Sequence, residues 1–379
     1  MKILVCVSEY PPINSSGKGN VAYNLVERLK KKADCKVCSP TGPDIVLGST
    51  NLIQKTGIIG ILYFWFKVSF FLKTADFDII WLHDPLPVFK LSSKSIVSTF
   101  HFTYLGFARN MRHVVSWFLN FYFNIAAVIE KFCLKKLVNS PFIGVSIQMT
   151  NELKEICPGK KDIFTVLNGV DTKRFIPSLN RESGIKKELG IEKNPVILFV
   201  GRLEQNKSVD LVIKSLPYTL QKFPKVKLLI VGDGTEKNNL IALSKKLDVA
   251  EAIIFCGNKS QEILPQFYSA SDVVVCPWSG LVLFEAMAAG RPIVATNIEW
   301  HAEVITHMQN GILVEHLNIE ELAKGVNLLL SDPALSNNLG KKAREFAVNN
   351  LDWEAIADQY FDIFLNLDNA NYISNKYLK

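Results

Sequence analysis

The chain has 379 residues, of which 48% are hydrophobic and 21% charged, and its formal net charge is +7. This is the composition of a globular protein, and the length exceeds the roughly 250–300 residues that one hydrophobic core usually holds, so it predicts two domains. The lysines form scattered pairs without a block of five like charges, which disfavours nucleic acid and leaves a phosphate-rich ligand or an anionic membrane surface as the expected partner.

Short apolar runs alternate with longer helical patterns, which is typical of parallel sheets covered by helices. The first half is predicted to contain strands at residues 3–7, 35–39, 78–82, 95–99, 142–145 and 163–167. The second half is predicted to contain strands at 196–200, 227–231, 252–256, 272–276, 292–296 and 311–314, followed by helices at 319–330, 334–349 and 352–366. The predicted fold class is α/β with two parallel-sheet domains.

The domain boundaries follow from a polar segment between the two sets of strands. We predict a first domain at residues 1–170, a linker at 171–195, a second domain at 196–350, and a final helix and tail at 351–379 that cross back to the first domain. The first strand begins almost at Met1, which leaves no room for a signal peptide and favours a cytoplasmic protein.

A glycine motif precedes the first predicted helix, at residues 21–29. Gly17 and Gly19 fit the dinucleotide pattern G-x-G-x-x-A, but about ten residues separate Ser8 from Gly17, which is longer than an ordinary βα turn. No acidic residue ends the second strand either. We therefore disfavour a nicotinamide cofactor and interpret the loop as lining donor phosphates and acceptor.

Two aromatic stretches lie in the first half, at residues 57–72 and 114–129. Each is shorter than the roughly 20 apolar residues of a membrane span, so neither predicts a transmembrane helix. They are either helices buried on the first sheet or surfaces for peripheral contact with the inner face of a membrane that holds a lipid-linked acceptor.

One histidine, His101, directly follows the strand at 95–99 and stands among aromatic residues. A lone histidine in such surroundings is either a core residue or a functional group. The sequence around it does not choose between the two interpretations.

The second half places cations and a glutamate after strands. Arg202 and Lys207 follow the strand at 196–200 and can reach one diphosphate, although two surface cations are the alternative. Glu285 opens a predicted helix, where it could serve only as a dipole partner. Backbone N–H groups just before it could face a phosphate; they belong to Gly280, Leu281 and Val282.

Together these blocks resemble the family-four (group 1) glycosyltransferases of the GT-B fold, over nearly the whole chain. The blocks are residues 8–19, His101, residues 166–175, and a second-half series comprising 201–207, 232–234, Asp272, 285–288 and Glu303. The resemblance implies two Rossmann-like domains that face each other across a cleft. It also implies transfer of a hexose from a nucleoside-diphosphate sugar to a hydroxyl on a glycan or lipid-linked glycan, with retention of configuration and without metal or cofactor.

The resemblance further implies roles for individual residues. His101 would act near the transferred sugar, Arg202 and Lys207 would stabilise the leaving diphosphate, and Glu285 would bind the ribose hydroxyls. Gly17 and Gly19 would line the donor site.

One departure concerns the segment before Glu285. Family members carry an additional glutamate eight residues ahead of it, whereas this chain has Pro277 there. Trp278 and Ser279 become the candidate sugar contacts. A non-catalytic nucleotide-sugar-binding relative or scaffold subunit is therefore the alternative to an active enzyme.

Overall fold

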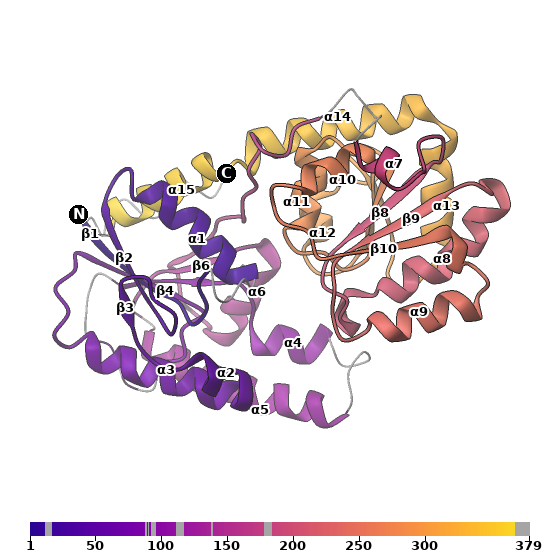
Figure 1. Cartoon of the computed structure of the whole chain (residues 1–379). Helices are drawn as coiled ribbons and strands as arrows, with labels where there is room; N and C mark the ends of the chain where they lie inside the picture. Colours follow the sequence, from indigo (N-terminus) through magenta and orange to yellow (C-terminus); the bar gives the residue numbers. More distant parts are fainter. Residues whose placement is uncertain are drawn as a thin grey trace. The chain divides into compact units, whose positions relative to one another are not determined.

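The computed structural model describes residues 1–11, 17–87, 89, 91, 96–110, 117–137, 139–177 and 184–367. The chain divides into two compact units by its internal contacts. Unit 1 comprises Met1–Asn168 and the segment from Trp353 onward, and unit 2 comprises Gly169–Asp352. Figure 1 shows each unit as a sheet with helices on its faces.

Unit 1 is built on a seven-stranded parallel sheet with strand order β3-β2-β1-β4-β5-β6-β7. The strands are β1 (Lys2–Cys6), β2 (Asp34–Ser39), β3 (Ile45–Val46), β4 (Ile79–His83), β5 (Ile96–Phe100), β6 (Phe142–Gly144) and β7 (Ile163–Thr165). Strands β4 and β5 are buried at every position, which explains why apolar residues make up most of both.

The helices of unit 1 are α1 (Gly17–Leu29), α2 (Thr50–Thr56), α3 (Ile58–Phe71), α4 (Tyr104–Asn110), α5 (Trp117–Leu134), the 3₁₀ turn η1 (Lys135–Leu137), α6 (Ile147–Ile156) and α15 (Trp353–Leu365). Helix α15 packs beside α1 and closes the core of the unit (Figure 1). Its Tyr360 and Phe364 rings lie 5.1 Å and 5.3 Å from the ring of Trp81 on β4.

Unit 2 is built on a six-stranded parallel sheet with strand order β10-β9-β8-β11-β12-β13. The strands are β8 (Val196–Val200), β9 (Lys227–Val231), β10 (Ile253–Gly257), β11 (Val273–Cys276), β12 (Ile293–Asn297) and β13 (Ile312–Glu315). Counted from β8, this is the 3-2-1-4-5-6 order of a Rossmann sheet. The prediction of two parallel-sheet α/β domains is confirmed.

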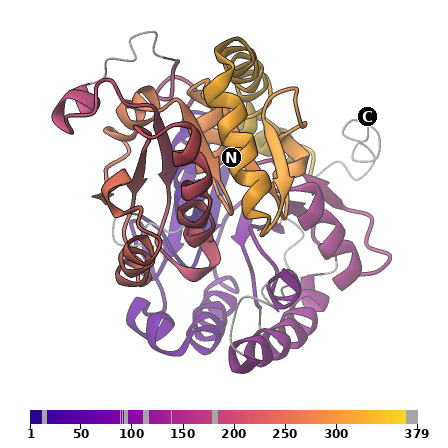
Figure 2. The same ribbon diagram turned by 90° about the vertical axis from the view of Figure 1, so that its right-hand side faces the viewer.

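The helices of unit 2 alternate with its strands; Figure 2 shows this unit from another side. They are α7 (Gly184–Glu188), the 3₁₀ turn η2 (Gln205–Lys207), α8 (Val209–Lys222), α9 (Lys237–Lys246), η3 (Ala250–Ala252), α10 (Leu264–Ala270), α11 (Val282–Ala288), α12 (His301–Val304), α13 (Ile319–Ser331) and α14 (Pro333–Asn350).

In each sheet, the side on which successive strands are added changes at one place, the topological switch point. In unit 1 this place lies between β1 and β4, and in unit 2 between β8 and β11, because successive strands are added on opposite sides of these pairs. Ligands of open α/β sheets bind outside the carboxyl ends of the strands at such points. The topology therefore marks one candidate site in each unit.

Three elements differ from those predicted from the sequence. Strand β3 was missed because two residues give no periodicity. Helix α7 forms inside the predicted linker and packs against α10. Helix α1 begins at Gly17 and not at residue 21, so both motif glycines lie in its first turn, while residues 12–16 of the motif lie outside the described part of the chain.

The two aromatic stretches form helices α3 and α5, although residues 114–116 lie outside the described part. On α5 the buried positions are few: Ala126, Glu130, Cys133 and Leu134. Each helix packs one face on the core of unit 1, as the first interpretation expects, and leaves its other face exposed. Within the described residues, no helix is both long and apolar enough to cross a membrane.

Candidate functional site

Two glycines hold the strand ends together at the switch point of unit 2. A Cβ at Gly232, which follows β9, would lie 1.8 Å from the carbonyl oxygen of Gly201, and one at Gly234 would lie 2.4 Å from that of Leu203. Any side chain at either position would push the two loops apart. This close approach fixes the path of Gly201 and of the neighbouring Arg202.

The structure brings Arg202 and Lys207 into one electrostatic environment. Lys207 ends the 3₁₀ turn η2, and Ser208 then takes a left-handed conformation (φ 51°, ψ 37°) that starts α8. Burial lowers the pKa of Lys207, the negative charge of Glu299 opposes this effect, and the positive charge of Arg202 lowers the pKa further. Two cations that repel each other after the same strand form a favourable place for an anion.

The loop after β11 forms the other wall of the switch point. Helix α11 begins at Val282, with Leu281 as its N-cap residue, three residues earlier than the sequence predicted. The N–H of Leu283 donates to Gly280 and that of Glu285 donates to Leu281. The start of α11 thus lies at the carboxyl edge of the sheet, as a phosphate site needs.

Glu285 lies in the first turn of α11 and is buried. Its Oε2 accepts a hydrogen bond from the Tyr268 hydroxyl at 2.8 Å, and its Oε1 accepts one from Gln261 at 3.4 Å. Burial raises the pKa of this carboxyl, while the two hydrogen bonds lower it. A carboxylate retains further lone pairs beyond these two bonds, so Glu285 can still accept from hydroxyls of a ligand.

His301, on α12, anchors the loop that precedes α11, and sequence reasoning missed it. Its Nε2 lies 3.3 Å from the backbone nitrogen of Ser279, and its Nδ1 lies 2.9 Å from the carbonyl oxygen of Thr296. The Thr296 hydroxyl in turn donates to the carbonyl of Pro277. The loop that carries Pro277 is therefore held by buried polar groups.

Trp278 and Ser279, the candidate sugar contacts, have buried side chains. The Trp278 ring packs edge-on against His316, with centroids 5.7 Å apart. The contact of Trp278 and Ser279 with the donor sugar stays a prediction, and in this structure the indole of Trp278 packs against the protein.

We expect Trp278→Ala to act mainly on stability. Removing a buried indole leaves a cavity, which lowers the free energy of unfolding by about 3–5 kcal/mol. Urea denaturation measures this loss, and Trp117→Ala is the matched control because that indole is 79% exposed. Equal stability of the two variants would contradict the observed packing.

Two other residues of the second-half series take different places. Asp272 precedes β11, and its carboxylate accepts the N–H of Val196 at 2.8 Å and lies 3.5 Å from the Lys186 ammonium. These contacts lie at the amino ends of the strands, so Asp272 belongs to the opposite edge from the candidate site. Glu303 lies on the short helix α12 and is partly exposed.

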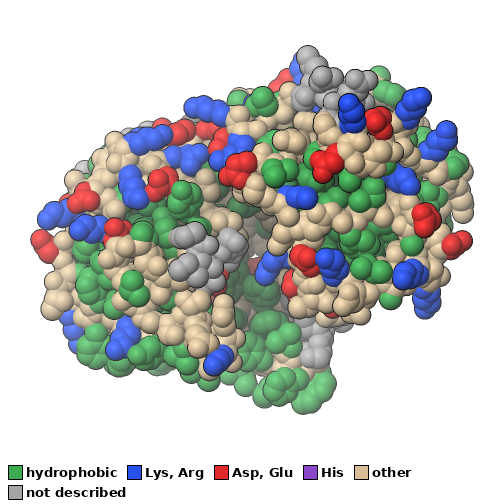
Figure 3. All heavy atoms as spheres, in the orientation of Figure 1, with side chains coloured by type: hydrophobic (Ala, Val, Ile, Leu, Met, Phe, Trp, Pro, Cys, Tyr) green, Lys and Arg blue, Asp and Glu red, His purple; other side chains and the backbone are tan. Residues whose placement is uncertain are grey.

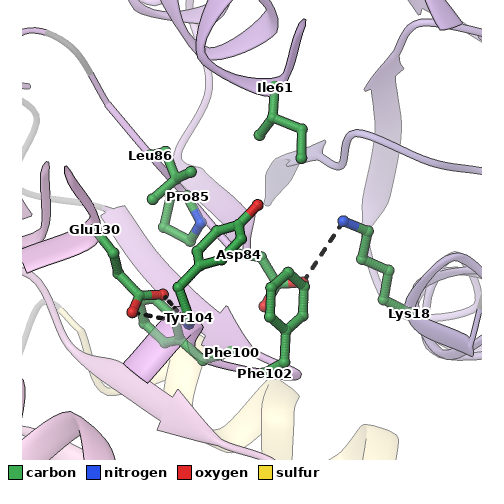
Figure 4. Close-up of a pocket in the computed structure, with 9 residues that line it drawn as sticks. All are labelled: Lys18, Ile61, Asp84, Pro85, Leu86, Phe100, Phe102, Tyr104 and Glu130. Carbon is green, nitrogen blue, oxygen red and sulfur yellow. Dashed lines mark hydrogen bonds and ion pairs between the residues drawn. The ribbon is translucent and has the colours of Figure 1, made fainter. Parts of the chain in front are cut away.

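The switch point of unit 1 gathers a carboxyl group and an ammonium group, those of Asp84 and Lys18 (Figure 4), together with two imidazoles. Asp84 directly follows β4 with a φ of 47°, an uncommon conformation for a residue other than glycine. Its Oδ1 accepts the N–H of His101 at 2.7 Å, and its Oδ2 lies 3.9 Å from the Lys18 ammonium of α1. Lys18 also lies 3.7 Å from Glu9, which follows β1.

His101 pairs with a second histidine that the sequence did not single out. Its Nε2 lies 2.8 Å from Nδ1 of His83, and the two rings are stacked. Burial lowers the pKa of His101 to about 3, with the charge of Lys18 adding to the effect, and burial also lowers the pKa of His83. Both rings are therefore neutral at physiological pH, and His101 can exchange hydrogen bonds without carrying charge.

The pKa of Asp84 shifts upward, whereas the pKa values of the two histidines shift downward. Burial raises its pKa to about 6, although the charge of Lys18 opposes the shift. Within the part of the chain that the structure describes, its buried Oδ2 accepts no hydrogen bond. A small cavity of about 10 Å³, roughly one water in size, opens beside these groups and is lined by Lys18, Ile61, Asp84, Pro85, Leu86, Phe100, Phe102, Tyr104 and Glu130 (Figure 4). The arrangement can receive a polar group at the carboxyl edge of the sheet.

Glu130, on α5, closes this cavity from the far side. It is buried and accepts the backbone N–H of Tyr104 at 3.0 Å, and that of Leu105, at the start of α4. Burial raises its pKa to about 8, and the charges of Asp84 and Glu152 add to the effect, whereas the two backbone hydrogen bonds oppose it.

This pKa predicts a pH-dependent stability. An acid with a raised pKa in the folded state stabilises the fold while it is protonated, and this contribution is lost as pH rises from about 4.3 to about 8. We expect the free energy of unfolding to fall by on the order of 5 kcal/mol over this range and Glu130→Gln to lack that part of the fall. Urea denaturation across pH measures the difference, and parallel profiles would contradict it.

The motif glycines lie close to this unit 1 site. Gly17 begins α1 immediately before Lys18, and a Cβ there would meet no heavy atom within 4 Å. Gly19 is buried within the helix. The predicted glycine loop is thus, in its described part, the first turn of α1. Among the described residues, no three His, Cys, Asp or Glu side chains are placed to share a metal ion.

Comparison with known protein families assigns the chain. The model described as "Glycosyl transferases group 1" matches residues 181–346, and that described as "Glycosyltransferase Family 4" matches residues 15–174. Between them they span most of both units. The chain belongs to the group 1, family 4 glycosyltransferases.

A curated relative and two solved structures illustrate the likeness. Glycogen synthase of Mycobacterium tuberculosis is 29% identical over 292 residues, which are 75% of this chain and 67% of the relative. The matches span about half to two thirds of the length of the curated relatives. Sucrose-phosphate synthase from Thermosynechococcus elongatus superposes with a TM-score of 0.80 at 21% identity, covering 97% of this chain and 99% of that one.

The second solved structure is the Anabaena protein HepE in complex with UDP-glucose. It superposes with a TM-score of 0.71 at 19% identity, covering 97% of this chain and 100% of HepE. At these identities the two structures establish the fold, which is GT-B.

Proposed function

We propose that this protein is a glycosyltransferase that moves a hexose from a nucleoside-diphosphate sugar to a hydroxyl acceptor, a glycan or lipid-linked glycan. The observation that carries the proposal is that Arg202 and Lys207 follow β8, and α11 follows β11, the strand that pairs with β8 at the switch point of the second sheet. Cations and a helix start at one sheet edge suit a diphosphate. The UDP-glucose bound by HepE is a ligand of this class.

The proposed chemistry follows from what develops during transfer. As the glycosidic bond to the diphosphate breaks, negative charge grows on the leaving phosphate, and Arg202 and Lys207 stabilise it. These cations can supply the positive charge that a bound divalent metal ion supplies to the leaving group in other enzymes. We therefore propose a metal-independent reaction without a cofactor. We also propose retention of configuration, with the leaving diphosphate assisting the acceptor hydroxyl on the same face of the sugar.

We assign the acceptor hydroxyl to the unit 1 site. Neutral His101 is held by His83 and offers a hydrogen bond without a charge, while Asp84 presents an oxygen that accepts no hydrogen bond from the described residues. A hydroxyl needs one acceptor and one donor, and this pair can supply both.

The alternative is a non-catalytic nucleotide-sugar-binding relative, and Pro277 at the family's glutamate position favours it. A thermal-shift screen of UDP, GDP and ADP sugars tests donor binding, and turnover of the stabilising donors over a panel of glycan and lipid acceptors tests transfer. Stabilisation with transfer supports the enzyme. Stabilisation without transfer across the panel supports the alternative, and no stabilisation by any donor contradicts both.

A further inference from the structure

Two neighbouring helices of unit 1 present large apolar side chains to the outside. On α5 they are Trp117, Phe118, Phe121, Ile125, Val128 and Phe132, which are 79%, 68%, 56%, 47%, 71% and 64% exposed. On α3 they are Ile59, Tyr63, Phe66 and Phe70, which are 36–64% exposed. We call these ten residues the α3/α5 face. Figure 3 shows hydrophobic side chains gathered along the lower edge of unit 1, over these helices.

The spacing of these residues makes each helix two-sided. Most of them recur every three or four positions, which places them along one stripe of a helix. The opposite side of α5 carries the buried Ala126, Glu130 and Cys133. The two helices meet where the N–H of Ile58 donates to the hydroxyl of Tyr122 at 2.9 Å. Scattered exposed apolar residues are normal, whereas two adjoining stripes mark an interaction surface.

The charged side chains on the helices of the α3/α5 face are almost all positive. The exposed Asp76 and Asp78 lie beyond the end of α3, where both contact Lys2. Helices α2, α3 and α5, the turn η1 and the residues just after α3 carry Lys55, Lys67, Lys73, Lys131, Lys135 and Lys136. The one acidic side chain of these four elements is Glu130, which is buried against the start of α4. The surface is therefore apolar and basic together.

Several of these lysines lie beside exposed rings. The ammonium of Lys136 is 4.4 Å from the centre of Phe132, that of Lys73 is 4.5 Å from Phe70, and that of Lys67 is 5.6 Å from Tyr63. At a bilayer surface, rings enter the boundary between headgroups and acyl chains while ammonium groups stay with the headgroups. The pairing of ring and cation matches this layered environment.

We propose that the α3/α5 face docks on the surface of an anionic lipid bilayer. Charge complementarity selects this occupant, because phosphate headgroups attract the lysines while apolar side chains bury between lipids. A second copy of the chain would bring the same lysines against each other, and like charges oppose that contact. This inference deepens the proposed function by locating the acceptor at a membrane, but docking needs no sugar nucleotide, so the two are tested separately.

Vesicle flotation of the full chain tests the proposal. We compare phosphatidylcholine vesicles with vesicles of equal parts phosphatidylcholine and phosphatidylglycerol, without any donor. We expect binding to the anionic vesicles at about 0.1 M salt and weaker binding near 1 M, where the Debye length falls from about 10 Å to about 3 Å. Binding to neither kind of vesicle would overturn the proposal.

A matched pair of triple variants separates this face from apolar surface in general. Trp117→Ser, Phe121→Ser, Val128→Ser should lower partitioning at least tenfold, because three exposed apolar side chains no longer enter the lipid. Tyr218→Ser, Leu328→Ser, Val348→Ser, at positions 40–45% exposed in unit 2, should bind as the unchanged protein does. Equal loss of vesicle binding in both triple variants, or no loss in the α5 triple variant, would overturn the proposal.

Two further measurements identify what covers the α3/α5 face. Brominated lipids should quench tryptophan fluorescence of the bound protein, and Trp117→Phe should lose most of the quenching, because Trp117 is the exposed indole of this face. Thermal unfolding and nucleotide binding of the α5 triple variant should match the unchanged protein. Sedimentation that shows a dimer abolished by that variant, without vesicle binding, would replace lipid with a second copy as the occupant.

Discussion

Replacing Arg202 or Lys207 with alanine is expected to lower turnover by on the order of 10²–10³. The physical reason is that both cations act on the charge that develops on the departing diphosphate, and the burial that lowers the pKa of Lys207 also removes the water that would otherwise screen it. Initial rates at saturating donor measure the effect, with thermal unfolding recorded for each variant.

Lys214→Ala is the matched control for this prediction. Lys214 lies on α8, the helix that follows Lys207, and pairs at 2.7 Å with Asp210 on the solvent-facing side. Its removal should leave turnover within about twofold, since an exposed pair of this kind contributes little. Near-normal rates in both Arg202→Ala and Lys207→Ala would withdraw these residues from the site.

The double variant with alanine at both positions tests whether Arg202 and Lys207 act on the same group. If Arg202 and Lys207 hold the same diphosphate, their effects on the activation free energy should not add, because the groups interact directly. Strict additivity would instead indicate two independent sites of action.

Glu285→Gln is expected to weaken nucleoside diphosphate binding about 10–100-fold. A carboxylate makes stronger hydrogen bonds to hydroxyls than an amide oxygen does: a bond to a charged group contributes about 1.5–3 kcal/mol and a neutral one about 0.5–1.5 kcal/mol, so two weakened bonds account for the expected loss. The amide oxygen of glutamine can still accept from Tyr268, so the helix start should keep its packing. Calorimetric titration with the nucleotide that the donor screen selects measures the change.

Binding of the ribose hydroxyls by Glu285 can be tested with a nucleotide that lacks one of them. The unchanged protein should bind a 2′-deoxy nucleoside diphosphate more weakly than the ribose form, and this preference should shrink in Glu285→Gln. A preference that persists at full size, or an affinity that does not change, would reduce Glu285 to a partner of Tyr268 and of the helix start. Thermal unfolding distinguishes that outcome from simple loss of structure.

Much of the fold could be read from the sequence because the central parallel strands are buried on both faces. The run Val196–Val200 is apolar at every position and buried at every position, and it gave the right strand limits. Strand β3 and helix α7 were missed because two and five residues are too few to show a period.

The residues of the candidate site also divide into those that the sequence located and those that it did not. Arg202 and Lys207 follow one strand closely, so local order along the chain already placed them at one edge of the sheet. Asp84 offered a similar signal, since it directly follows the buried strand β4 and ends at the same edge as His101. It was overlooked because no motif surrounds it.

The sequence by itself determined the two parallel sheets, the cations after β8 and the family, because these depend on residues close together in the chain. Only the tertiary structure decided what depends on distant contacts. It buried Trp278 against His316, set His83 on His101, and left the α5 stripe outside the core. An apolar run shows that a segment prefers to leave water, but only the neighbours it meets decide whether protein or another partner covers it.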